Sequence, residues 1–356
     1  MDRSDLTRRH LLLGIGAGAG ALALSGASRH ARAAPGRETS ALAIIYLNGG
    51  PAGLFNSAGS FLRSGAFGVT HDNVRSLGND LLVDAATFGA LPARALAHMA
   101  SINFRHGYQR HDFARAALLQ SGSRSNLLLL AQAFPDPAPI RCAVVNTLGL
   151  PDGVDRDPPR EGGTPLVRVT ELDQIGLVGA SAGANALATA RSAYRVPASG
   201  NLVGDAATSL CATELLLRAG TSVVFTQPMF AGRPDRQIDT HGDTTGAEAR
   251  RLFGTIQAPL ATFLERTLAL PGKNVVVVLV GEFSRTVGES DHEPGGTATV
   301  IGKYVKTGTA APQAETGAPP PETPPPAGLW SYLASALRLD DHPFGSNPNP
   351  GLVAAY

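Results

Sequence analysis

The sequence predicts an α/β domain with a buried parallel sheet, and two apolar runs support that prediction. Residues 275–280 form an unbroken aliphatic run that is too short to span a membrane and is bounded by Asn274 and Gly281. Such a run is typical of a strand buried on both faces, which is the usual environment of a parallel strand. A second run, 41–47, is predicted to be the first buried strand. It ends in the glycine-rich turn 48–53, which is expected to let the backbone approach a ligand closely.

The next part of the chain is predicted to alternate between helices and short strands. Residues 91–99 and 113–120 have helical character, and 140–145 and 166–169 have the apolar character of short strands. Residues 151–165 are polar and rich in proline, which indicates a surface loop.

The second half continues the alternation as far as the central strand. A helix is predicted over 210–219, a strand over 222–226, and a longer helix over 252–268 that leads into the strand 275–280. Pro259 is expected to kink or split that longer helix, because proline removes one helical hydrogen bond and clashes with the preceding turn.

The C-terminal region is predicted to contribute little to the core. Residues 307–327 are rich in proline, alanine, glycine and threonine, which favours a disordered surface insertion. A short helix over 329–339 and an irregular tail over 340–356 complete the chain. The expected organisation is therefore a leader over 1–34, an α/β domain over 40–306, the insertion over 307–327, and a helix and tail of the same domain over 328–356.

The N-terminus has the layout of a twin-arginine export signal. Arg8 and Arg9 stand directly ahead of a glycine-diluted apolar run, 11–27, and small residues over 31–33 supply a cleavage site. The mature protein is expected to be periplasmic or extracellular, with no transmembrane segment after cleavage. An uncleaved N-terminal membrane anchor is the second interpretation.

Composition limits the class of partner and the size of the core. The chain has 356 residues and is 43% apolar, which is ample for one large α/β domain or two small ones. A formal net charge of +1 gives no reason to expect a nucleic acid or an anionic membrane as partner. Cys142 and Cys211 can either pair in an oxidising compartment or stay as two buried thiols.

Candidate site residues follow the strands. Ligands of open α/β sheets bind beyond the carboxyl ends of the strands, and Glu282 and Arg285 lie just past the central strand. Asp239, His241 and Asp243 alternate, so in an extended segment they project to one face and can converge on a cation. The other residues that can complete this site are His111, Asp291 and His292.

A metal-assisted reaction would suit these residue types. Imidazole and carboxylate ligands together suit zinc, manganese or iron, and two such ions would clamp the attacking and leaving oxygens of a phosphate or sulfate ester. The expected cofactor is a divalent metal such as zinc, manganese or calcium. Each residue also has a structural interpretation: Asp243 or Asp239 can cap the helix that starts near Thr245, and Glu282 with Arg285 can form an ion pair.

Several motifs stand in a fixed order along the chain. They are the leader, Gly49-Gly50, the Arg110-His111-Asp112-Phe113 helix start, Asp239-Thr240-His241, Gly281 to Thr286, Asp291-His292 and Gly302 to Val305. This ordered set resembles the exported bacterial proteins called domain of unknown function 1501, which are distantly related to the alkaline phosphatase and sulfatase superfamily. The resemblance implies an alkaline-phosphatase-like three-layer α/β/α sandwich with a mainly parallel sheet. It also implies a metal-dependent hydrolase that acts on phosphate or sulfate esters.

Two positions depart from the pattern of that family. Ala52 stands where a branch of the family has an acidic residue that looks like a metal ligand, and Arg110 stands where members tend to have serine. Loss of a carboxylate lowers the affinity for a divalent ion. The protein can therefore be an enzyme with a degraded site, or an inactive relative in which Arg110 and Arg285 bind the oxyanion of a small anionic ester or glycan.

Two other functions stay open at the level of sequence. Ser181 lies in a Gly-x-Ser-x-Gly motif, 179–183, which a serine esterase or peptidase would use as a nucleophile elbow between a strand and a helix. Asp239 or Asp291 with His241 or His292 would follow Ser181 in the right order, and the turn 48–51 would supply the oxyanion hole. The third interpretation is an exported scaffold without catalytic activity, with the proline-rich segment presenting polyproline turns to a protein partner.

Overall fold

The computed structural model describes residues 38–50, 53–136, 138–146, 160–161, 164–178, 183–231, 238–284, 292–310 and 314–355. Several predictions concern residues outside these ranges, namely the leader 1–34, Ala52, Ser181, Arg285 and Asp291. Within the described part of the chain, no helix combines the length and the hydropathy that crossing a membrane requires.

A central sheet organises the described residues. Its strands run in the order β13-β4-β12-β11-β1-β10-β7-β9-β8. Their bounds are β1 Thr39–Tyr46, β4 Met99–Arg105, β7 Cys142–Val145, β8 Arg160–Glu161, β9 Thr164–Val169, β10 Val223–Thr226, β11 Lys273–Val280, β12 Gly295–Gly302 and β13 Gly308–Ala310. Two small hairpins pair β2 Val74–Gly78 with β3 Leu81–Asp84, and β5 Gln120–Ser121 with β6 Arg124–Ser125.

Helices flank the sheet and connect its strands. The α-helices are α2 Ala93–Leu96, α3 His111–Leu119, α4 Asn126–Ala133, α5 Asp173–Val178, α6 Gly183–Ala193, α7 Ala206–Arg218, α8 Ala247–Thr267 and α9 Pro326–Ala336. Short 3-10 helices cover Ala58–Phe61, Ala66–Gly68, His71–Asn73, Phe88–Ala90 and Pro350–Leu352.

The sheet is mainly parallel, as the sequence predicts. β1 pairs in parallel with both β10 and β11, and the parallel run continues from β10 through β7 to β9. On the other side, β12 runs antiparallel to β11 and to β4. The carboxyl ends of β1, β4, β10 and β11 therefore meet at one edge of the sheet, together with the beginning of β12.

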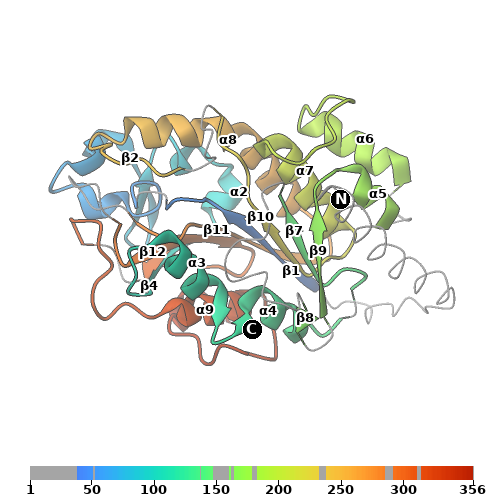
Figure 1. The fold of residues 1–356 in the computed structure, drawn as a ribbon. Coiled ribbons are helices and arrows are strands. Elements are labelled where there is room, and N and C mark those ends of the chain that lie inside the picture. Colours follow the sequence, from blue (N-terminus) through green and yellow to red (C-terminus); the bar gives the residue numbers. More distant parts are fainter. Residues whose placement is uncertain are drawn as a thin grey trace, which may run out of the picture. The chain divides into compact units, whose positions relative to one another are not determined.

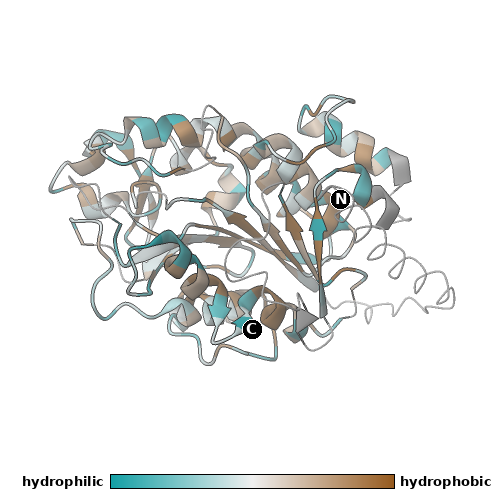
Figure 2. Ribbon diagram, in the orientation of Figure 1, coloured by the Kyte–Doolittle hydropathy of each residue, from teal (hydrophilic) through white to brown (hydrophobic). Residues whose placement is uncertain are grey.

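The layers follow from the two-residue period of a strand. In β1, Ala41, Ala43 and Ile45 pack into the core beneath α7 and α8. Their neighbours Leu42, Ile44 and Tyr46 face the opposite core, with α4 and α9. Figure 1 shows α6, α7 and α8 on one face of the sheet and α3, α4 and α9 on the other. Figure 2 shows that the strands between them are mainly apolar. This arrangement confirms the three-layer α/β/α sandwich.

The two cysteines lie on opposite faces of this sheet. Cys142 of β7 packs with α4 and α9, whereas Cys211 of α7 packs in the other core. Both are buried free thiols. Burial raises the pKa of both thiols, that of Cys211 to about 12. The sequence left open a disulfide or two buried thiols, and the structure has two separate buried thiols.

β12, which pairs with the central strand β11, and β4, which pairs with β12, differ from the sequence prediction. The helix predicted over 91–99 is limited to α2, and Met99 already begins β4. β12 was not predicted from the sequence, and it begins with two glycines. A Cβ on Gly296 would lie 2.8 Å from the ring of Phe104 in β4, and a Cβ on Gly295 would overlap the carbonyl oxygen of Phe104. The absence of side chains at these two positions therefore allows β12 to pack closely against β4.

The proline-rich segment 307–327 was predicted to be a disordered insertion, but several of its described residues contact the sheet. β13 pairs in parallel with β4. The backbone N–H of Arg105 donates to the carbonyl of Pro324 at 2.9 Å, and its guanidinium donates to the carbonyl of Pro319 at 3.1 Å. The carbonyls of this segment thus satisfy donors at the end of β4, which composition alone does not indicate.

α8 also differs from its prediction, because it is not split at Pro259. It continues as one element from Ala247 to Thr267. Its buried face includes Leu252, Phe253, Ile256, Leu260 and Phe263. Packing of this face against the sheet offsets the hydrogen bond that the proline removes.

Candidate functional site

The candidate site lies at the carboxyl edge of the parallel strands, where the sequence predicts it. Glu282 follows β11, and Asn48 and Gly49 follow β1. The backbone N–H of Ile238 donates to the carbonyl of Asn48 at 2.8 Å, which joins the segment of Asp239 to the turn after β1. His111 is the first residue of α3.

Four predicted residues meet around one carboxylate oxygen. Oδ2 of Asp239 lies 3.0 Å from Nε2 of His241, 3.5 Å from Nε2 of His111 and 3.7 Å from Nε2 of His292. One ligand atom from each of His111, Asp239 and His292 lies within 4.8 Å of the other two. Asp239 is buried, whereas the side chain of His241 is 47% exposed. Nitrogen and oxygen donors this close together fit a divalent transition metal.

Glu282 lies behind His111, outside the group of donors that surrounds Asp239. Its Oε1 accepts a hydrogen bond from Nδ1 of His111 at 2.8 Å. Its Oε2 accepts from the hydroxyl of Tyr46 at 2.6 Å and from the backbone N–H of Gly49 at 3.2 Å. Glu282 was predicted to be a metal ligand. In this geometry both of its oxygens accept hydrogen bonds from other residues, and Glu282 orients His111 instead.

The charge of Glu282 fixes the orientation of His111. Burial by itself raises the pKa of this carboxyl, but hydrogen bonds from His111 and Tyr46 and the nearby charge of Arg115 more than offset burial and hold the pKa below its ordinary value. An ionised carboxylate only accepts hydrogen bonds, so Nδ1 of His111 carries the proton. In the neutral imidazole, Nε2 then presents its lone pair toward Asp239.

His292 is oriented in the same way by a backbone group. Its Nδ1 lies 2.9 Å from the carbonyl oxygen of Gln109, and a carbonyl can only accept. Nδ1 therefore donates, and Nε2 is the nitrogen that faces Asp239. The ring of His292 also stacks on Phe283, with centroids 4.1 Å apart and planes at 2°.

The glycine turn after β1 supports that stack. Gly50 has φ +79°, and a Cβ there would lie 2.8 Å from both the Cβ and the carbonyl oxygen of Phe283. The sequence predicted that this turn would let the backbone approach a ligand closely. The close approach in the structure is to Phe283, the partner of His292.

His106 was not predicted to contribute to the site, but it contacts the backbone of Glu282 and the ring of Phe283. The backbone N–H of Tyr108 donates to Nδ1 of His106 at 3.1 Å, so Nε2 carries the proton and donates to the carbonyl of Glu282 at 2.7 Å. Burial lowers the pKa of His106, which agrees with a neutral ring. The sequence signal was the dense run of polar and aromatic residues over 105–112.

Two predicted residues have other roles. Asp243 accepts from the backbone N–H of Ala249 at 2.8 Å, so it caps the start of α8, as the structural interpretation proposed. Arg110 is exposed, forms an ion pair with Asp112 at 3.0 Å and lies over the ring of Phe113. Arg285 and Asp291 lie outside the described residues.

The structure does not place the Gly-x-Ser-x-Gly motif after a strand, as a serine hydrolase requires. A nucleophile elbow follows a strand, but the residues ahead of the Gly-x-Ser-x-Gly motif form the helix α5. Ser181 itself lies outside the described residues. The backbone N–H of Gly49, which was considered as an oxyanion donor, donates to Glu282 instead.

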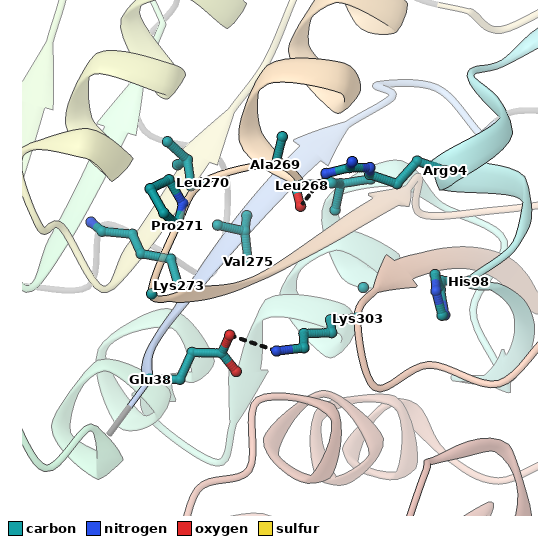
Figure 3. Close-up of a pocket in the computed structure, with 12 residues that line it drawn as sticks. Glu38, Arg94, His98, Leu268, Ala269, Leu270, Pro271, Lys273, Val275 and Lys303 are labelled. Atoms are coloured by element: carbon teal, nitrogen blue, oxygen red, sulfur yellow. Dashed lines mark hydrogen bonds and ion pairs between the residues drawn. The ribbon is translucent and has the colours of Figure 1, made fainter. Parts of the chain in front are cut away.

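A cavity of about 400 Å³ lies at the opposite edge of the sheet, beside the beginnings of β1 and β11 (Figure 3). Its charged side chains already have partners. Lys303 pairs with Glu38 at 2.7 Å, and Arg94 donates to the carbonyl of Leu268 at 3.4 Å (Figure 3). Lys273 donates to the carbonyl of Leu217. This cavity lacks the convergence of donors that marks the carboxyl edge.

Comparisons with known proteins found likenesses only among solved structures. No family model matches the chain, and no curated protein matches it. A protein of the alkaline phosphatase superfamily from Vibrio parahaemolyticus is similar with TM-score 0.41 and 12% identity over 88% of this chain and 70% of that one. Lipoteichoic acid synthase LtaP from Listeria monocytogenes is similar with TM-score 0.42 and 12% identity, over 86% of this chain and 74% of that one.

A third similar structure is the phosphonate monoester hydrolase SpPMH from Silicibacter pomeroyi, with TM-score 0.37 and 12% identity over 88% of this chain and 76% of that one. Structural similarity at this low identity and TM-score says nothing about the activity of this chain. The sheet order and the two cores define the fold, and the distances between donor atoms define the site.

Proposed function

We propose that this protein is an exported, metal-dependent hydrolase of phosphate or sulfate esters with a single metal ion held by His111, Asp239 and His292. The observation that supports it most is the approach of one donor atom from each residue to within 4.8 Å of the others. The ordered motifs that resemble domain of unknown function 1501 support the reaction class, and the twin-arginine layout supports export.

The surroundings of the two histidines fit a metal centre. Metal-binding histidines commonly donate their second ring N–H to a carboxylate or a carbonyl, which orients the ring and selects the tautomer. His111 donates Nδ1–H to Glu282, and His292 donates Nδ1–H to the carbonyl of Gln109. Both Nε2 atoms thereby lie near the same oxygen of Asp239, Oδ2.

One metal ion suits this donor set better than two. Asp239 supplies one carboxylate, Glu282 is engaged with His111, and position 52, an acid in a branch of the resembling family, is alanine. When bound, a divalent ion there supplies a positive charge that polarises an ester oxygen. The chain's own residues keep the two histidine rings in place. Glu282, which accepts a hydrogen bond from Tyr46, restrains His111, and Phe283 restrains His292.

The test is hydrolysis by the purified mature protein loaded with zinc or with manganese. We expect turnover of 4-nitrophenyl phosphate or 4-nitrophenyl sulfate that stops when the metal is removed with a chelator and returns when it is added back. The Asp239→Asn variant should lose this activity, whereas Asp243→Asn, the same change at the cap of α8, should keep it.

Two results would contradict the proposal. Turnover of neither ester by metal-loaded protein would favour an inactive relative that binds oxyanions. Turnover of an aryl carboxylate ester that resists chelation and is lost in Ser181→Ala would favour the serine hydrolase.

A further inference from the structure

Two exposed aromatic side chains lie in contact beside the candidate site. Among the described residues, the large hydrophobic side chains that are exposed are Tyr108 at 46%, Phe113 at 49% and Leu202 at 62%. The rings of Tyr108 and Phe113 stack with centroids 5.9 Å apart and planes at 30°. In the sequence they flank His111, which is one of the proposed ligands.

A series of ring contacts joins this pair to the proposed metal ligands. Tyr108 stacks on His106 at 6.1 Å, and His106 meets Phe283 edge to face at 5.6 Å. Phe283 in turn stacks on His292 at 4.1 Å. The exposed pair is therefore continuous with the site and is not an isolated surface feature.

The pair is held in place before any ligand arrives. The backbone N–H of Tyr108 donates to His106, whose other ring nitrogen donates to the carbonyl of Glu282. Phe113 lies in the first turn of α3, and the guanidinium of Arg110 covers its ring at 4.8 Å. Rigid aromatic side chains bind with a low entropic cost because few rotamers are lost.

The charge beside the pair is balanced, so the pair offers shape and apolar surface more than charge. Arg110 forms an ion pair with Asp112 at 3.0 Å. Single exposed hydrophobic side chains are ordinary, but a stacked pair at the margin of a site is the kind of surface that binds a ligand. An aromatic face favours another flat ring, or the apolar face of a sugar ring.

We infer that Tyr108 and Phe113 form a subsite for an uncharged ring with an apolar face in the alcohol part of the ester. This inference rests on the proposed function, because the phosphoryl or sulfuryl group has to lie at the metal for its alcohol to reach the pair. Esters of small alkyl alcohols leave the pair exposed, whereas esters of an aromatic or pyranose alcohol cover it. The subsite thus selects among esters by the shape of the leaving group.

The experiment compares three phosphonates that the protein cannot hydrolyse, each titrated calorimetrically into the zinc-loaded full chain. They are methylphosphonate, phenylphosphonate and a glucosyl C-phosphonate. We expect one of the two ring compounds to bind about tenfold more tightly than methylphosphonate, as a stacking contact allows. Preference for phenyl identifies an aromatic alcohol, and preference for glucosyl identifies a sugar.

Variants assign that preference to the pair. In the Tyr108→Ala/Phe113→Ala double variant, and in Phe113→Ala if the double variant does not fold, the ratio of the two dissociation constants should fall toward one. Leu202→Ala, the third exposed hydrophobic position, should keep the ratio of the wild type.

The outcomes separate the subsite from the proposed function. Binding of methylphosphonate without preference for either ring, or a preference that survives in the folded variants, would overturn the subsite alone. Binding of none of the three compounds by zinc-loaded protein would overturn the proposed function and the subsite with it.

Discussion

At the scale of single residues, the site depends on which nitrogen of each histidine carries a proton. The pKa of Glu282 lies below its ordinary value, because the hydrogen bonds and the charge of Arg115 more than offset burial, so this residue accepts Nδ1–H of His111 as a carboxylate. Its second oxygen accepts from Tyr46 and Gly49. Glu282 is therefore a positioning residue for His111.

The Glu282→Gln variant should bind zinc about 10- to 100-fold more weakly, which is the usual effect of losing a group that orients a metal ligand. An amide of the same shape has to place its NH₂ against either Nδ1–H of His111 or N–H of Gly49, and both are donors. Competition with a chromophoric chelator measures the affinity. Tyr46→Phe removes one hydrogen bond to Glu282 and keeps the charge, so it should lose less zinc affinity. Equal zinc affinity in Glu282→Gln and the wild type would contradict the role assigned to Glu282.

At the scale of elements, one buried carboxylate joins three helices on the face of the sheet away from α9. Glu214 of α7 is buried and accepts from Arg266 of α8 at 2.7 and 2.8 Å. It also accepts from Arg218 at 2.6 Å and from the hydroxyl of Tyr194, beyond the end of α6, at 2.8 Å. A buried carboxylate with this many donors is costly to alter on one side only.

Replacing Glu214 by glutamine should lower the free energy of unfolding by about 3–5 kcal/mol, because Arg218 and Arg266 are left beside an uncharged partner. Urea unfolding followed by circular dichroism measures this change. Arg251→Gln, which breaks the exposed pair with Glu248, is the matched control and should cost about 1 kcal/mol or less. Equal losses in the two variants would contradict the assigned role of Glu214.

The same group predicts how stability depends on pH. Burial raises the pKa of Glu214, and hydrogen bonds from Arg266 and Arg218 more than reverse that effect, so the pKa in the folded protein lies below the ordinary 4.5. A lowered pKa means that the contribution of Glu214 is complete above pH 4.5 and is lost as the pH falls through the folded-state pKa. The stability difference between wild type and Glu214→Gln should therefore shrink in acid, and a difference that grows there would refute this linkage.

At the scale of the whole molecule, the sandwich gathers distant residues at one edge. His111 comes from the start of α3, Asp239 from the segment after β10, and His292 from the segment before β12. The donors are close to one another only in the folded chain. Metal binding and folding should therefore be linked.

Zinc at 100 times its dissociation constant should raise the free energy of unfolding by about 2.7 kcal/mol in the wild type. Thermal or urea unfolding with and without the metal measures the difference. Asp239→Asn should show much less of it. Equal stabilisation of both proteins would mean that the metal binds elsewhere.

Most of the fold could be predicted where burial leaves a local signal. β1 and β11 are aliphatic runs because both of their faces are covered by helices. β12 could not be predicted, because its Gly295 and Gly296 are required by contact with Phe104, which lies far away in the sequence. The path of the proline-rich segment depends in the same way on hydrogen bonds to Arg105.

The candidate site was only partly predictable, for the same reason. Asp239 and the three histidines around it stand in recognisable motifs. Tyr46 and Phe283 look like ordinary core residues, and their roles arise from contacts with Glu282 and His292 that only the folded chain brings about. The role of Glu282 likewise depends on its distance from His111.

The most direct test of the central claim is the metal content of the purified protein, measured by elemental analysis after zinc loading and removal of free metal. Wild type and Asp243→Asn are expected to retain about one metal ion per chain, and Asp239→Asn is expected to retain far less. Wild-type protein without bound metal, or Asp239→Asn with as much metal as wild type, would contradict the account.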